Sequence, residues 1–64
     1  MEFKKIKGVV SGFINGERVV KIVKVGSGFN KWHIMKGSDE TFFEVINFAD
    51  TLAYAKSLAE EIKF

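Results

Sequence analysis

The dipeptide Asn15-Gly16 constrains the fold of this chain more than any other feature, because it lies between two runs rich in β-branched residues. Asn and Gly both accept positive φ, and together they supply the central residues of a type I′ turn, the favoured two-residue connection of a β-hairpin. The sequence therefore predicts antiparallel strands at about 3–14 and 17–25. Further strands are expected near 31–36 and 41–46, with turns at 26–30 and 37–40.

The C-terminal part of the chain is predicted to be helical. Asn47 is the expected N-cap, and Asp50 follows it where a carboxylate suits the helix dipole. At about 100° per residue, one face collects the apolar positions: Phe48, Thr51, Leu52, Ala55, Leu58, Ala59 and Ile62. The small Ala55 and Ala59 at the centre of this face are expected to let the helix backbone come close to the sheet.

Together these elements predict one small α+β domain over residues 1–64. Its expected architecture is an antiparallel three- to four-stranded β-meander (β-β-β-β-α) with one C-terminal helix packed on one face. At this length a domain buries only about 60% of the surface that its unfolded chain exposes. Self-association is one way for such a chain to bury more.

The hairpin register predicts which side chains share a face of the sheet. With a two-residue loop Gly12 faces Val19, and alternation assigns the other residues. The face expected to meet the helix holds Ile6, Gly8, Val10, Gly12, Ile14, Val19, Val23 and Val25, with Lys4, Glu17 and Lys21 toward its ends or edges. The opposite face is expected to hold Phe3, Val9, Phe13, Val20 and Ile22, together with Lys5, Lys7, Ser11, Arg18 and Lys24. A slip of one residue or a β-bulge at the turn would exchange the two sets.

One helix is too narrow to cover such a sheet. Four strands at ~4.8 Å spacing span roughly 19 Å, whereas a helix is ~10 Å across. Apolar side chains on the other face are then left in water, and a contiguous exposed apolar area usually marks an interface. We therefore expect a homodimer, with self-association through Val9, Phe13, Val20 and Ile22.

The charges are sorted along the chain. Residues 1–36 contain eight Lys and Arg against two Glu, and residues 37–64 contain two Lys against six Asp and Glu, so a net charge of +6 precedes one of −4. A positive field on a sheet surface steers anionic partners. The candidate nucleic-acid contacts, to DNA or RNA, are Lys5, Lys7, Phe13, Arg18 and Lys24: cations for phosphates and a ring for stacking. The alternative is a protein-binding inhibitor or adaptor that uses the same face or a sheet edge. Lysines on an outer sheet face also serve solubility alone.

No pattern in the chain predicts catalysis, a cofactor or a metal site. His33 is the only histidine and cysteine is absent, so the usual zinc ligand sets cannot form. The Gly26-Ser27-Gly28 segment lacks the following helix and spaced lysine of phosphate-binding loops. Trp32 is expected to anchor the core, and the alternative is a stacking site at one end of the sheet. No stretch is long and apolar enough for a bilayer span. With no cysteine, the chain is expected in the reducing cytoplasm.

The order of three or four strands followed by one helix resembles the arm-binding domains of tyrosine recombinases, in which a sheet lies in the major groove. This resemblance implies DNA binding and carries no residue role to this chain. The sequence of the segment from Phe48 to Lys56 resembles segments of many small phage and prophage proteins. This resemblance implies a phage or mobile-element origin.

Overall fold

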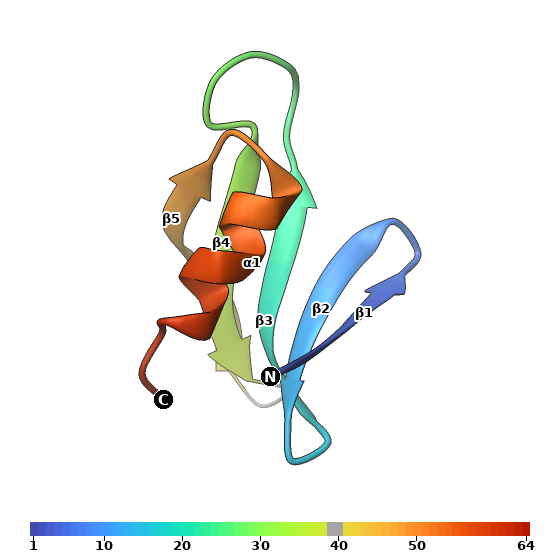
Figure 1. Ribbon diagram of the computed structural model, residues 1–64. Coiled ribbons are helices and arrows are strands. Elements are labelled where there is room, and N and C mark those ends of the chain that lie inside the picture. The colour runs from blue at the N-terminus through green and yellow to red at the C-terminus, as the bar shows by residue number, and fades with distance from the viewer. Residues whose placement is uncertain (39–40) are drawn as a thin grey trace.

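The computed structural model of the protein describes residues 1–38 and 41–64. Its elements are β1 (Glu2–Ile6), β2 (Val9–Ile14), β3 (Glu17–Lys24), β4 (Trp32–Ser38), β5 (Thr41–Ala49) and α1 (Leu52–Glu60). The strands form one antiparallel sheet in the order β1-β2-β3-β4-β5, and α1 lies across one face of it (Figure 1). The α+β meander with a C-terminal helix is confirmed, but the sheet has five strands instead of three or four. Of the turn predicted at 37–40, positions 37 and 38 belong to β4, and 39 and 40 lie outside the described residues.

The additional strand arises from a second tight turn at Lys7-Gly8. The φ angles of these two residues are 51° and 81°, nearly the same as the 52° of Asn15 and the 80° of Gly16. Both dipeptides therefore adopt the positive-φ pair that a two-residue hairpin connection requires. The Asn15-Gly16 turn is confirmed, whereas the single strand predicted at 3–14 is two strands, β1 and β2.

A β-bulge next to the β2–β3 turn changes which residues of β3 face the helix. Gly12 pairs with Val20 instead of Val19, so Val19 is an extra residue on β3. Because side chains alternate along a strand, this one-residue shift moves Val20 and Ile22 to the helix side, where both are completely buried. The predicted assignment of these two residues to the exposed face is therefore wrong.

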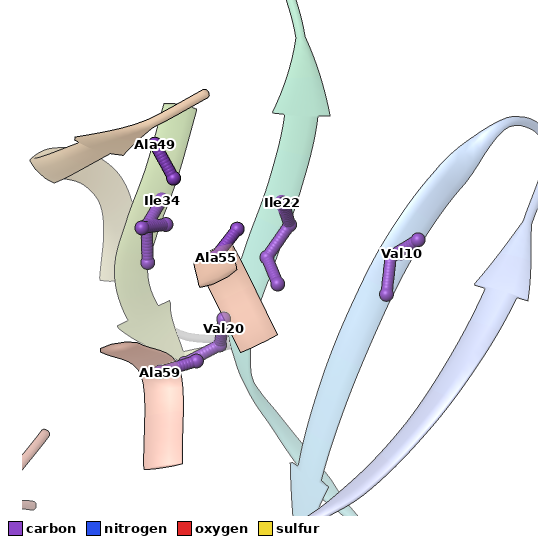
Figure 2. Close-up of a cluster of buried hydrophobic side chains, with 7 residues drawn as sticks. All are labelled: Val10, Val20, Ile22, Ile34, Ala49, Ala55 and Ala59. Carbon is purple, nitrogen blue, oxygen red and sulfur yellow. The ribbon is translucent and has the colours of Figure 1, made fainter. Parts of the chain in front are cut away.

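The core lies between α1 and the sheet (Figure 2). Its buried apolar members are Val10, Val20, Ile22, Ile34, Ala49, Ala55 and Ala59. The two alanines of α1 are completely buried, as their place at the centre of the helix face predicted. Short side chains on the helix allow its backbone to lie close to the branched residues of β3 and β4.

The helix begins later than the sequence predicted. Thr51 is the N-cap, and its Oγ1 accepts a hydrogen bond of 3.1 Å from the backbone N of Tyr54. The helix then runs from Leu52. Asn47, the predicted cap, lies inside β5, which continues as far as the buried Ala49. The prediction failed because β5 continues past Asn47 to place Ala49 in the core, and the chain turns into the helix only after that.

Candidate functional site

The candidate site lies on the face of the sheet opposite α1, called here the open face. Residues paired directly across two strands share a face, so the register identifies its members. Phe13 on β2 pairs with Arg18 on β3, and Ser11 pairs with Lys4 on one side and Lys21 on the other. Within residues 1–38 and 41–64 every strand belongs to this sheet and α1 is the single helix, so no second layer covers the open face.

Each of two phenylalanine rings on the open face lies close to a cation. Lys4 Nζ is 5.6 Å from the centroid of the Phe13 ring. Lys21 Nζ and Arg18 Cζ are 4.5 Å and 5.8 Å from the centroid of the Phe43 ring. We call these five residues the basic-aromatic strip: Lys4, Phe13, Arg18, Lys21 and Phe43. The strip crosses the sheet from β1 to β5, and it combines positive charge with flat π surfaces.

Gly37 explains how a residue of β5 reaches cations on β3 across the intervening strand. A Cβ atom at Gly37 would lie 2.8 Å from Phe43 Cγ and 2.9 Å from Phe43 Cα, too close for any real side chain. The missing side chain on β4 therefore makes room for the Phe43 ring to lean across β4 towards Lys21.

Two open hollows border the strip. The first, of about 460 Å³, lies beside Lys4 and Phe13 and extends to the β2–β3 turn. The second, of about 410 Å³, lies beside Arg18, Lys21 and Phe43. Phe13 borders the first hollow and its cross-strand partner Arg18 borders the second, so the two hollows adjoin the same pair of residues. Each hollow thus offers one aromatic ring of the strip together with at least one cation.

Beside the strip, the open face carries an apolar cluster formed by Val23, Met35, Val45 and Phe48. Met35 pairs with Val45, while His33 pairs with both Val23 and Phe48. The His33 and Phe48 rings meet edge to face with centroids 4.9 Å apart. Val45 is 43% exposed and Phe48 is 47% exposed. The open face therefore presents apolar side chains to solvent next to its charged strip.

The structure brings together only part of the predicted nucleic-acid contacts. Phe13 and Arg18 are cross-strand neighbours on the open face. Lys5 and Lys24 pair with Val10 and Trp32, which belong to or pack against the core, so both lysines lie on the helix side of the sheet. Lys7 lies in the β1–β2 turn. The five residues do not form one surface.

The predicted self-association residues are also divided. Phe13 lies on the open face, and Val9 pairs with Ile6 at the far end of the β1–β2 hairpin. Val20 and Ile22 have no exposed surface because they lie beneath α1. Neither of the last two is available to a partner in this fold.

Three residues of the strip were missed by the sequence analysis: Lys4, Lys21 and Phe43. Reading Lys7-Gly8 as a turn would have placed Lys4 on the open face beside Ser11. No residue type in β3 predicts the bulge that brings Lys21 to the open face. The partners of Phe43 depend on the register between β4 and β5, which the sequence does not define.

Other predicted features have structural roles. Trp32 packs against the core. The segment containing Gly26 and Gly28 connects β3 to β4, and both glycines have positive φ. Among the described residues, no three His, Cys, Asp or Glu side chains gather as potential metal ligands. In the same residues, no helix has the length and apolar character needed to cross a bilayer.

No family model, curated protein or solved structure matches this chain.

Proposed function

We propose that this protein is a small non-enzymatic binding module that contacts nucleic acid through the basic-aromatic strip. The observation that carries the proposal is that cations lie close to the phenylalanine rings of the open face. The closest pair is Lys21 Nζ and the centroid of the Phe43 ring, 4.5 Å apart. Cations of this kind neutralise phosphates, and neighbouring rings contact bases or sugars. A surface that offers both groups side by side suits a ligand that repeats phosphate and base.

The distribution of acidic residues favours the open face as the side that attracts an anion. Among residues 1–38 and 41–64, Glu2 is the acidic residue that pairs into the strip, and its Oε1 lies 3.5 Å from Lys4 Nζ. Glu44 pairs with Lys36 on the helix side, and Glu60 belongs to α1. A positive patch with few anions steers polyanions and raises their rate of association.

The charge part of the proposal is tested by two reversals on the same strand. Lys21→Glu changes the strip, whereas Lys24→Glu makes the same change in net charge on the helix side. We expect Lys21→Glu to weaken binding at least about tenfold and to reduce the log–log salt slope by about 0.9 on duplex DNA or 0.7 on single strands. Lys24→Glu should have a much smaller effect. Equal effects of the two variants would remove the strip as the binding surface.

The second part of the proposal is self-association through the apolar cluster. The support is that Val45 and Phe48 are close to half exposed on the open face. Full burial of such a side chain is worth about 1.5–3 kcal/mol, so covering the exposed half of each stabilises an assembly by roughly half that amount. If another protein covers the cluster instead, the chain is the inhibitor or adaptor of the alternative prediction, and its own mass in solution separates the two cases.

A further inference from the structure

Resting on the proposed nucleic-acid function, we infer that the ligand is single-stranded, and that its unstacked bases occupy the two hollows beside Phe13 and Phe43. The positive charge of the strip does not by itself distinguish a duplex from a single strand. The residues that line the two hollows and the width of the strip do.

The second hollow has the chemistry of a base-binding site. Phe42 and Phe43 supply aromatic walls, and Lys21 supplies a cation. The hydroxyls of Ser38 and Thr41 lie on the same rim and are hydrogen-bonded to each other at 2.9 Å; their remaining donor and acceptor capacity faces the polar edge of a base in the hollow. In a duplex both flat faces of a base are covered by its neighbours, so only an unstacked base can lie against these rings.

The first hollow also offers a ring and a cation, with the carboxylate of Glu2 on its rim 3.5 Å from Lys4 Nζ. Phe13 supplies the ring and Lys4 the cation, and Asn15 at the β2–β3 turn supplies a side chain with both donor and acceptor atoms. With a volume of about 460 Å³ it is comparable to the second hollow, which measures about 410 Å³. Two similar hollows along one strip suit two bases of one strand.

The width of the strip argues against a duplex. The strip runs across all five strands, from Lys4 on β1 to Phe43 on β5. Five strands at ~4.8 Å spacing cover roughly 19 Å between the outer strands. The major groove of B-DNA is about 12 Å wide and admits a helix or a two-stranded ribbon. The full strip cannot enter that groove, whereas a single strand can lie along it.

The cations above the rings do not prevent stacking. A cation over an exposed ring contributes about 2- to 5-fold to an equilibrium constant, whereas stacking of one base contributes about 5- to 150-fold. A base can therefore displace the Lys21 ammonium from the Phe43 ring. The displaced ammonium remains beside the base, where it can pair with a phosphate.

The test compares a labelled thymidine oligonucleotide of about 12 nucleotides with a duplex of the same length, by fluorescence anisotropy at one salt concentration. We expect the wild-type protein to bind the single strand at least about tenfold more tightly. Phe42→Leu and Phe43→Leu should each weaken single-strand binding by about 5- to 150-fold. Phe29→Leu is the matched control: Phe29 is 90% exposed in the β3–β4 loop and borders neither hollow.

Phe42 keeps the test informative even if a substitution at Phe43 disturbs the fold. Phe42 is 94% exposed, so its replacement by Leu removes little packing, and thermal unfolding checks this. Equal or tighter binding of the duplex would overturn this inference and leave the proposed function standing. Single-strand preference that survives both Phe42→Leu and Phe43→Leu would overturn the placement of the bases. Absence of binding to either oligonucleotide would overturn the proposed function as well.

Discussion

At the scale of single residues, Gly37 shows how a missing side chain shapes the candidate site. The nearest atoms to a Cβ at this position are Phe43 Cγ at 2.8 Å and the backbone O of Phe42 at 2.9 Å. Neither is the end of a flexible side chain, so neither can swing aside. At Gly12 a Cβ would instead meet the side chains of Met1 and Phe3, at 3.1 Å from Met1 Cγ and 3.2 Å from Phe3 Cε1.

We expect Gly37→Ala to lower the free energy of unfolding by about 1–3 kcal/mol, because the added methyl overpacks a site closed by backbone. The same change should displace the Phe43 ring and weaken nucleic-acid binding. Gly12→Ala is the control, since the flexible Met1 side chain can move, and its cost should be smaller. Chemical denaturation of the three proteins measures the change in stability, and fluorescence anisotropy with the labelled oligonucleotide measures the change in binding. Unchanged stability of Gly37→Ala would show that β4 and β5 can separate without cost.

Ser11 makes a second prediction at this scale. It is completely buried between Lys4 and Lys21, and its Oγ has no hydrogen-bond partner within the described part of the chain. A buried hydroxyl without a partner costs about 1–3 kcal/mol. Ser11→Ala should therefore raise the free energy of unfolding by about 1 kcal/mol. A loss of stability would instead reveal a partner for Ser11, such as a bound water.

The exposed Ser57 provides the comparison for Ser11. Its Oγ donates a hydrogen bond of 3.2 Å to the backbone O of Ala53 within α1. Because this hydroxyl is also in contact with water, Ser57→Ala should change stability by less than about 0.5 kcal/mol. A difference between the two serine variants then reports the environment of Ser11 and not the substitution itself.

At the scale of the elements, the distance between α1 and the sheet depends on Ala55 and Ala59, which are completely buried over β3 and β4 (Figure 2). A leucine at position 55 must push the helix away or adopt a strained rotamer. We expect Ala55→Leu to lower the free energy of unfolding by about 1–3 kcal/mol. Ala53→Leu adds the same atoms at an exposed position of the same helix and should be close to neutral. Urea denaturation with both variants checks the prediction, and equal stability would mean that the interface is loosely packed.

The elements also show how far the fold can be predicted from the sequence. The turn at Asn15-Gly16 was predictable because both residues favour positive φ. The turn at Lys7-Gly8 was missed because lysine does not favour that conformation, and only the glycine indicates it. The bulge at Val19 lies in a run of strand-forming residues, so no change in composition marks it.

The same bulge decides how much of the candidate site could be predicted. Phe13 and Arg18 lie between the turn and the bulge, where the simple hairpin register holds, and both were assigned to the correct face. Lys21 and Ile22 lie beyond the bulge, and the alternation of side chains placed each of them on the wrong face. A single extra residue thus exchanges a surface cation with a core residue.

At the scale of the whole molecule, the two faces of the sheet differ because α1 lies against one of them (Figure 1). One side carries α1, the core and the salt bridge of 3.6 Å between the N-terminal ammonium and Glu60. The other side carries the strip and the apolar cluster without a second layer among the described residues. A chain of 64 residues has little apolar surface to leave unused, because domains of this size are only marginally stable. This asymmetry is the reason to look for a partner on the open face.

Self-association is the prediction that belongs to this scale. If a second copy covers the apolar cluster, the wild-type protein should sediment with the mass of a dimer, and Phe48→Asp should sediment as a monomer. In a two-fold dimer each Phe48 is buried once per chain, so the substitution removes two contacts, each worth roughly half of the ~1.5–3 kcal/mol of full burial, and adds two carboxylates that resist burial. Tyr54→Asp is the matched control, because Tyr54 is 56% exposed on α1, outside the open face. A monomeric wild-type protein would leave the cluster to a different protein, whereas a Phe48→Asp dimer would place the contact between copies elsewhere on the molecule.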